Sequence, residues 1–593
     1  MIVAAVLAAA VVAGPSALPS LPGVTPAPAA STLPGVSPAP PTRSTAAPSA
    51  APTVAPTPTP VPTPTPTPPP PADVAIVWHM AASTSADASV RAAAIALSAP
   101  DSLGAIERAL RAHPRAHFSL AIDAGALDGL ARAAAGESAL QTMAQGHLIG
   151  GARADMLRLL AQVPVLDDSL TMLPTARRYR ALAAAAPLAL AGQRAAAFSA
   201  SDYVEFAGFG ALVRLAAAGE LPANSPLLQK NALTDAEAVS AVDQLAAADR
   251  KTLDELKELA TSGQLELVAD PAGEPILPLL VDGGGKSGPN IVMVDAAADA
   301  AMLVDRALRG ATALSGVPAG VYSPHGAYDD NAATMLEQHH ASFALFSDRV
   351  LRSSPIGGSR DAVLAADSAA FHAYALRAAA GPALPTLFWS QDDSAALSVL
   401  SPRLPVGAMG TRVQELAAAA GARAGDGAII VLRIEADGLW DRRPDRARVV
   451  DSLAAALASG RPNSVSLGQY VRAHPSALTS YGFTPAADEG ALTYWMGTFN
   501  QAKMWTALGD ARRAAGGDAA LQRETTRAAL FEAEASHWYV TPNMIAPASE
   551  ITRLMDQFRV EIGKIYQTSG KAVPASIAPL SPEATPPPAR PHS

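Results

Sequence analysis

Short apolar runs alternate with long helical stretches from about residue 73 onward, and this alternation restricts the fold more than any other feature of the sequence. The runs are ADVAIVWHM from Ala72, HFSLAID from His117, QLELVAD from Gln264, FALFS from Phe343 and AIIVLRIE from Ala428. Such runs are typical of buried strands, and their separation by helices predicts an α/β fold with a parallel sheet or barrel. In that architecture, functional groups lie at the carboxyl ends of the strands.

Helix signals divide the chain further. The residues TDAE at Thr234–Glu237 form a capping box that opens a long amphipathic helix, and Gly263 is predicted to end it. Beyond about residue 475 the alternation stops, and helical patterns cover residues 489–513, 525–536 and 551–566. We therefore predict a barrel over residues 73–475 and a helical domain over residues 476–570.

The two ends of the chain have a different composition. Residues 1–14 are apolar and uncharged, which suits a signal peptide or a membrane anchor. Residues 15–72 are rich in proline, threonine and alanine and predict a disordered linker, and residues 571–593 predict a disordered tail. This arrangement favours a secreted or cell-surface protein attached through its N-terminal segment. The alternative is a cytoplasmic protein with an apolar, unstructured start.

Composition excludes several classes of function. The 593 residues are 49% hydrophobic and carry a net charge of -9, so nucleic acid is not an expected partner. There are no cysteines, which excludes disulfides and zinc-thiolate sites. The GGGK run at Gly283 lacks the spacing of a phosphate loop. His339 and His340 are neighbours in a predicted helix, where adjacent side chains point apart, so a shared metal is not expected.

Polar residues cluster where predicted strands end. The stretch Gly316–Asp330 reads as an exposed loop rich in glycine and proline, and it carries Tyr322, His325, Tyr328 and Asp329. His79 ends the first strand, Glu274 follows the third, and Glu435, Asp437 and Trp440 follow the last long strand. These positions suit a site at the mouth of a barrel. For the carboxylates after the last strand, a solvated turn with a helix cap is the alternative.

Several ordered segments resemble glycoside hydrolase family 57, the α-amylase, amylopullulanase and glucanotransferase group, across Asp73 to Gly570. The segments are IVWHMAAST, GQLELVADPAGEPILPLL, GVPAGVYSPHGAY, RIEADGLWDRRP, FNQAKMWTALGDARRA and EASHWYV. They are similar to the family's IVWHMHQPYY, GQIELSTTPYYHPILPLL, GxPxGMWPSEGSV, ILDGENAWEYYP, N-x-AW-x-x-L-x-x-AR and SDWFWW. The resemblance implies an incomplete (β/α)7 barrel followed by a helical domain, retaining cleavage of α-glucosidic bonds, and no cofactor or metal.

The same resemblance assigns roles to individual positions. His325 falls where the family has its nucleophilic glutamate, and Glu435 falls at the acid/base aspartate. Ala81 and Ala82 replace the histidine and glutamine of the family's first motif. The substrate-binding positions that the resemblance implies for an α-glucan or related oligosaccharide are His79, Glu274, Tyr322, Asp437 and Trp440. Retaining hydrolysis needs two carboxyl groups about 5 Å apart, which a histidine does not supply.

Two hypotheses follow. In the first, the chain is a glycosidase by descent that still acts on an α-glucan, with Glu435 as acid/base and Asp329, Asp330 or Glu274 as the second carboxylate in an inverting reaction. In the second, it is a secreted or surface pseudoenzyme whose barrel mouth binds a glycan or a protein. Loss of the nucleophile favours the second hypothesis, because removing such a group costs several orders of magnitude in rate.

Overall fold

The structure is a computed structural model that describes residues 70–81, 87–191, 198–282, 294–354, 370–377, 382–400, 404–436, 443–475, 478–480, 482–540 and 548–577. All of these residues belong to one compact unit. The predicted leader and almost all of the predicted linker lie outside the described residues, as does the tail beyond residue 577.

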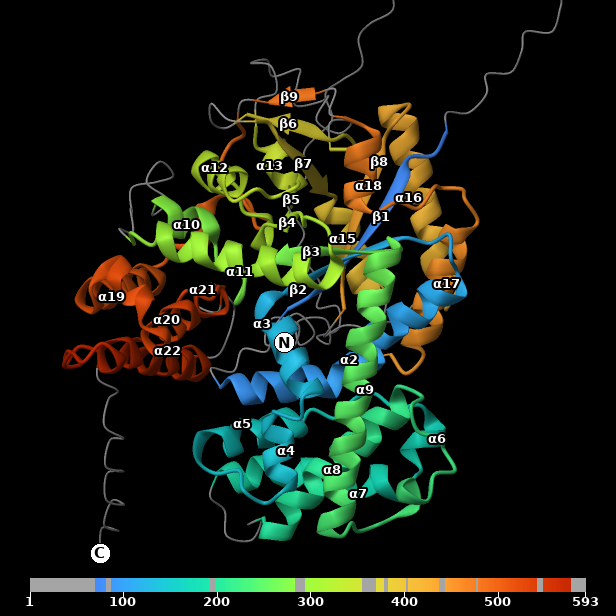
Figure 1. The fold of residues 1–593 in the computed structure, drawn as a ribbon, viewed down its shortest axis with the longest axis vertical. Coiled ribbons are helices and arrows are strands. Elements are labelled where there is room, and N and C mark those ends of the chain that lie inside the picture. Colours follow the sequence, from blue (N-terminus) through green and yellow to red (C-terminus); the bar gives the residue numbers. More distant parts are fainter. Residues whose placement is uncertain are drawn as a thin grey trace, which may run out of the picture. The chain divides into compact units, whose positions relative to one another are not determined.

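Seven parallel strands form the centre of the molecule (Figure 1). Their order is β8 (Ile429–Glu435), β1 (Asp73–Met80), β2 (Phe118–Asp123), β3 (Leu265–Asp270), β4 (Val321–Tyr322), β5 (Ala344–Ser347) and β7 (Leu384–Trp389). The short β6 (Tyr374–Leu376) pairs antiparallel with β7, and β9 (Leu478–Ser480) pairs parallel with β6. The predicted parallel α/β architecture is confirmed.

The seam between β7 and β8 makes the barrel incomplete. These strands form no ladder, but the Ser390 N–H, just after β7, donates to the Val431 carbonyl of β8 at 2.9 Å. Every second residue of a strand points inward, and Val77, Leu345 and Leu387 fill the interior with exposed fractions of 0%. The result is a seven-stranded parallel barrel of the (β/α)7 type.

Helices surround the barrel between successive strands (Figure 1). They are α2 (Ala88–Ala112), α3 (Ala124–Ala134), α9 (Asp235–Ser262), α10 (Leu277–Asp282), α11 (Ala297–Ser315), α12 (Asp330–Gln338), α13 (Asp348–Arg352), α15 (Gln391–Leu400), α16 (Ala408–Ala424), α17 (Arg446–Ala458) and α18 (Leu467–Ala473). The predicted capping box at Thr234 and the left-handed C-cap at Gly263 are both present. His339 and His340 instead follow the end of α12, so their predicted helical placement is wrong.

A layer of helices between β2 and β3 was not predicted as a separate feature. It contains α4 (Ala139–Ala144), α5 (Gly150–Leu160), α6 (Asp168–Thr171), α7 (Pro174–Leu190), α8 (Ala200–Ala217) and the short η2 (Pro226–Gln229). Together with the first half of α9, these helices enclose a hydrophobic cluster of their own around Tyr179, Phe206 and Phe209. The alanine-rich sequence predicts helices here, but it does not reveal that they pack mainly against one another.

Further helices follow the barrel, as predicted. They are η6 (Leu492–Trp495), α19 (Phe499–Ala515), η7 (Gly517–Gln522), α20 (Glu524–Ala533), α21 (His537–Val540) and α22 (Ala548–Thr568). The predicted start at Glu489 is ten residues early, because Thr498 caps α19. Trp495 and Trp505 belong to the same buried cluster as the outer face of the barrel. Among the residues that the structure describes, no helix has both the length and the apolar character needed to cross a membrane.

Candidate functional site

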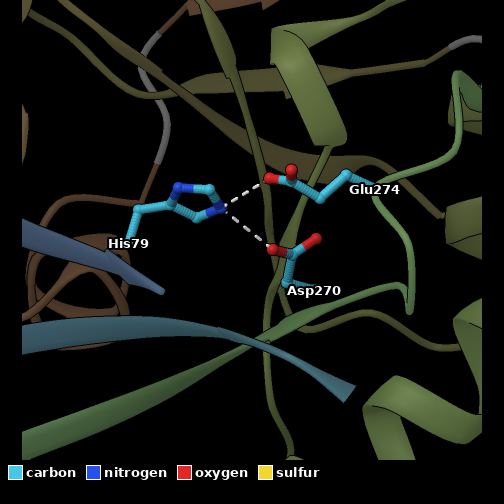
Figure 2. A group of neighbouring side chains, drawn as sticks. All are labelled: His79, Asp270 and Glu274. Atoms are coloured by element: carbon cyan, nitrogen blue, oxygen red, sulfur yellow. Dashed lines mark hydrogen bonds and ion pairs between the residues drawn. The ribbon is translucent and has the colours of Figure 1, made fainter. Parts of the chain in front are cut away.

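His79, at the end of β1, contacts carboxylates from two other strands and a loop. His79 Nδ1 lies 2.7 Å from Oε2 of Glu435 on the neighbouring strand β8. His79 Nε2 lies 3.1 Å from Oδ2 of Asp270, at the end of β3, and 2.9 Å from Oε1 of Glu274. Figure 2 shows both of these carboxylates directed at the same ring nitrogen. The carboxyl ends of three parallel strands thus bring opposite charges to one point.

The charges in this cluster perturb one another. Burial disfavours a charged imidazole, but the carboxylates of Glu435 and Glu274 outweigh it and raise the pKa of His79 well above its usual value. Burial also opposes ionisation of Glu435 and Glu274, yet His79 holds the pKa of each at about 2. Asp270 is fully buried, and there burial dominates and raises its pKa to about 7.

The turn after β3 holds Glu274 in position. Glu274 has a φ of 50°, a left-handed conformation that side chains rarely adopt. The preceding Gly273 donates its N–H to Oδ2 of Asp123 at 2.7 Å, and its carbonyl accepts the Ser536 N–H at 3.0 Å. Strained residues persist where the surroundings over-determine them, often at functional sites. The fold therefore holds the Glu274 carboxylate next to His79 by contacts on both sides of the turn.

Buried aromatic rings pack beside this cluster. Tyr322, at the end of β4, stacks on His79 at 4.7 Å and on Trp389 at 5.1 Å between ring centroids. The Arg433 guanidinium lies 5.1 Å from the centre of the Trp389 ring and donates to the Tyr322 hydroxyl at 2.6 Å. Arg433 also pairs with Asp488 at 3.1 Å and with Glu435 at 3.3 Å. One largely buried cation therefore links β8 to the segment after β9.

His325 faces the C-terminal part of the chain. Its Nε2 lies 2.9 Å from the Ser536 hydroxyl, its Nδ1 lies 3.8 Å from Glu489, and its ring centroid lies 4.4 Å from that of Trp495. Burial lowers the pKa of His325, but the Glu489 carboxylate outweighs burial and raises it. Like Glu274, His325 has a positive φ, here 54°. The position that the resemblance assigns to a nucleophile therefore carries an imidazole already bonded to a hydroxyl.

The structure brings most of the predicted site residues together. His79, Glu274 and Glu435 are in direct contact, Tyr322 stacks on His79, and His325 lies close enough to Glu274 to help lower the pKa of that carboxyl. Asp437 and Trp440 lie outside the described residues.

The predicted exposure of the loop around His325 is wrong. Tyr322, Tyr328 and Asp329 have exposed fractions of 1%, 0% and 6%. Tyr322 is part of β4, and Tyr328 exchanges backbone hydrogen bonds with Ala486. Asp329 caps α12 by accepting the Ala332 N–H at 2.6 Å. The loop is buried because the segment after β9 packs over it.

Sequence reasoning missed several residues of the cluster. Asp123 and Asp270 each end a strand, so the rule that located His79 also applied to them. Arg433 lies two residues before Glu435 on one strand and therefore shares its face. Asp488 and Ser536 come from distant segments, and no local pattern marks them.

Four polar side chains of the cluster remain partly accessible. Glu274, His325, Glu435 and Glu489 have exposed side-chain fractions of 21%, 21%, 29% and 28%. A cavity of about 450 Å³ reaches Glu274 from the side of α3 and α20. Such an arrangement suits recognition of a polar ligand by hydrogen bonds. In addition, His79, Asp270 and Glu274 each bring one potential metal-ligand atom to within 4.8 Å of the others.

Fold and site together define a (β/α)7-barrel protein with a charged cluster at the carboxyl-terminal mouth of the barrel. The family model for glycosyl hydrolase family 57 matches residues 196–348, a stretch that contains Asp270, Glu274 and His325. Over these residues the chain is similar to that family.

The solved structures that align with this chain share little sequence with it. A GH57 branching enzyme from Thermococcus kodakaraensis, solved in complex with glucose, aligns with a TM-score of 0.50 and 9% identity over 84% of this chain and 90% of the enzyme. A 4-alpha-glucanotransferase from Thermococcus litoralis aligns with a TM-score of 0.49 and 11% identity. The alignment covers 84% of this chain but only 60% of the glucanotransferase. The alpha-amylase AmyC from Thermotoga maritima aligns with a TM-score of 0.49 and 9% identity. The alignment covers 84% of this chain and 93% of AmyC. No curated protein matches the chain in sequence.

Proposed function

We propose that this chain binds an α-glucan or a related oligosaccharide at the mouth of its barrel and does not perform retaining hydrolysis. The observation that carries the proposal is the bonding of the two positions that retaining chemistry would use. His325 is hydrogen-bonded to Ser536, and Glu435 is held by His79 and Arg433. The solved branching enzyme of this fold was captured with glucose, which supports a sugar as the ligand here.

Retaining hydrolysis requires a carboxylate that attacks the sugar carbon and a second carboxyl group about 5 Å away that donates and then accepts a proton. An imidazole at the first position does not form the glycosyl ester. The pKa of Glu435 is held at about 2 by His79 and Arg433, against the effect of burial. A carboxyl group that stays ionised at neutral pH is a poor proton donor to a leaving sugar. Both roles therefore lack a suitable group.

The inverting alternative has one observation in its favour. Glu435 and Glu274 contact opposite nitrogens of one imidazole, which puts their carboxyl groups roughly 7 Å apart, inside the range of about 6.5 to 9.5 Å for inverting enzymes. However, the ring of His79 fills the interval in which the sugar carbon and the attacking water would have to lie. Both carboxylate side chains remain partly exposed, so they can also accept hydrogen bonds from sugar hydroxyl groups at the edge of the cluster.

We also propose that the protein is exported or attached to the cell surface. The proposal rests on the apolar residues 1–14 and on the proline-rich residues 15–72 that follow them. Mass spectrometry of the N-terminal peptide from fractionated cells tests it. Recovery from the cell surface or the medium is the expected result, and recovery of the protein in the cytoplasm alone would contradict it.

Calorimetric titration of the purified chain with maltoheptaose tests the binding proposal. Saturable binding at one site is expected, with at least a tenfold loss of affinity in Glu435→Gln and Glu489→Gln, because each change removes an acceptor for sugar hydroxyls. Glu415→Gln is the matched control, since Glu415 is exposed on α16, where it pairs with Arg412. Equal affinities in all four proteins would remove the barrel mouth as the binding site.

A further inference from the structure

We propose that His79 Nε2, Asp270 and Glu274 hold one divalent transition-metal ion, with Glu435 orienting the imidazole. This inference goes beyond the proposed glycan binding and does not depend on it. It also departs from the expectation, implied by the family resemblance, that no metal is present. The site takes its ligands from the ends of β1 and β3 and from the turn after β3.

The first argument is the convergence of two carboxylates on one nitrogen. Asp270 Oδ2 and Glu274 Oε1 lie 3.1 and 2.9 Å from His79 Nε2, as the dashed lines of Figure 2 show. That nitrogen carries at most one proton, so two carboxyl groups compete for a single N–H. The three atoms lie within 4.8 Å of one another. Bonds of about 2.0 to 2.2 Å to one ion require atoms roughly 3 to 4 Å apart, which small side-chain rotations provide.

The second argument is an unpaired oxygen. Asp270 has an exposed fraction of 0%, and its Oδ1 has no hydrogen-bond partner within the described residues. A buried carboxylate oxygen without a partner is costly, and native structures rarely leave one. A cation bound to the Asp270 carboxylate would satisfy the unpaired Oδ1, because a carboxylate can bind a metal through both of its oxygens. The cluster therefore offers more anionic oxygens than its own hydrogens can satisfy.

The third argument is the support around the ligands. Histidines that bind metals usually pass their second ring N–H to a carboxylate, which fixes the tautomer and the ring orientation. His79 Nδ1 lies 2.7 Å from Glu435, so Nε2 is free to act as the ligand in the metal-bound form. The Glu274 turn is likewise held, through the Gly273 N–H, by Asp123. Contacts from outside the proposed site thus hold both His79 and the Glu274 turn in place.

The donor set indicates the kind of ion. One imidazole nitrogen and two carboxylates suit Zn²⁺, Mn²⁺, Fe²⁺ or Co²⁺, whereas Ca²⁺ prefers six to eight oxygen ligands. Three protein ligands leave a coordination position for water or for a hydroxyl group of a ligand. Zn²⁺ is therefore the appropriate probe for affinity, and Co²⁺, which is coloured, is the probe for geometry.

The experiment is a Zn²⁺ titration of the full chain, prepared without a histidine tag and stripped with chelator, together with bound-metal counting. We expect one ion per chain. Asp270→Asn and Glu274→Gln should each weaken binding at least tenfold, and Glu435→Gln about 10- to 100-fold, as expected for an orienting carboxylate. His339→Gln is the control, because His339 also contacts one aspartate, Asp305, at 2.6 Å but lies outside the site. The chain has 11 histidines, so this control measures adventitious binding.

A second measurement keeps the test decisive if a variant folds poorly. Co²⁺ added to the unmodified chain should give the visible absorption bands of a low-symmetry site at one equivalent, and one equivalent of Zn²⁺ should abolish them. Circular dichroism of each metal-free variant checks its folding. Absence of one-to-one binding, or binding that survives both Asp270→Asn and Glu274→Gln, would overturn the proposal. Neither result would affect the maltoheptaose titration, so the two proposals fail separately.

Discussion

Arg433 balances the charge of two carboxylates in the cluster. Its guanidinium lies between Tyr322, Asp488 and Glu435, and its side chain is 16% exposed. The attraction of Asp488 and Glu435 outweighs the effect of burial and raises the pKa of Arg433. Burial in turn raises the pKa of Asp488 to about 6, although Arg433 opposes that rise. Removing the cation would leave the Asp488 carboxylate without its ion-pair partner, and Glu435 with His79 alone.

We predict that Arg433→Met lowers the free energy of unfolding by about 3 to 5 kcal/mol, because it leaves the largely buried Asp488 carboxylate without an ion-pair partner. Urea denaturation at pH 7 measures the change. Arg412→Met is the control, since Arg412 forms an exposed pair with Glu415 and should change stability by less than about 0.5 kcal/mol. A loss of similar size in both variants would contradict this account of Arg433.

Some residues of the site could be predicted from the sequence, and others could not. His79, Glu274 and Glu435 were recognisable because each lies at or just after the end of a buried run. Asp488 and Ser536 were not, because they reach His325 and Arg433 through tertiary packing of segments more than 50 residues away. The periodicity of apolar residues and the positions of strand ends indicate local structure only. They do not show which distant segment packs over the mouth of the barrel.

Among the elements, the turn from β4 into η3 (Pro324–Gly326) has little room for a larger side chain. Gly326 has a φ of 62°, and a Cβ there would lie 2.4 Å from the Ser347 Cβ and 2.8 Å from Trp389 Cζ2. This close approach seats His325 against the segment after β9. The glycine is required for space as well as for conformation.

Gly326→Ala should therefore destabilise the protein by about 2 to 4 kcal/mol, combining overpacking with left-handed strain. Gly136→Ala separates the two effects, because Gly136 has a φ of 79° and open space around it, so it should lose only about 1 to 2 kcal/mol. Thermal and urea unfolding of both variants measure the difference. If Gly326→Ala costs no more than Gly136→Ala, the packing around the turn is looser than described.

The N-cap of α12 predicts a pH dependence of stability. Burial raises the pKa of Asp329 to about 7, above its value in the unfolded chain. A carboxyl group whose pKa is higher in the folded protein than in the unfolded chain stabilises the fold at pH values below its unfolded pKa. For Asp329 this stabilisation is lost as the pH rises from the unfolded pKa of about 4 to the folded pKa of about 7. Asp329→Asn keeps a capping oxygen but does not titrate. Relative to this variant, the free energy of unfolding of the unmodified protein should fall by up to about 1.4 kcal/mol per pH unit in this window.

Urea unfolding at pH 5, 6, 7 and 8 measures this difference. Asp167→Asn is the control, because Asp167 also caps a helix, accepting the Leu170 N–H, but hydrogen bonds from Ser169 and Leu170 lower its pKa. The contribution of a lowered pKa is lost only as the pH falls below about 4, so the control difference should be flat from pH 5 to 8. Parallel curves for the unmodified protein and Asp329→Asn would argue against a buried, protonated Asp329.

Across the whole molecule, the barrel and the C-terminal helices share one hydrophobic cluster. Trp505, Leu530 and Ile562 belong to it together with Phe118 and Leu303 of the barrel layer. Arg512 of α19 also pairs with the buried Asp299 of α11, and the Arg512 Nε lies 2.9 Å from it. The domain boundary near residue 476, drawn from the change in sequence pattern, stays a prediction.

We predict that calorimetry of the full chain shows a single cooperative transition, because this core spans both parts. A chain truncated after residue 475 should bind a hydrophobic dye and lack a cooperative transition, since it exposes the apolar surface that α19 to α22 cover. Removal of residues 1–69, which composition predicts to be a linker, is the control and should leave the transition unchanged. Two separate transitions in the full chain would instead support independent domains.

Nuclear magnetic resonance of maltoheptaose mixed with the full chain tests the central claim most directly, because one sample reports both binding and cleavage. Saturation transferred from protein to sugar reveals contact, and the anomeric signals reveal new reducing ends and their configuration over days. We expect transfer that Glu435→Gln weakens, with no new anomeric signals. Steady release of α-anomeric product that Glu435→Gln abolishes would contradict the account, because it would show that retaining hydrolysis proceeds with His325 in place of a carboxylate.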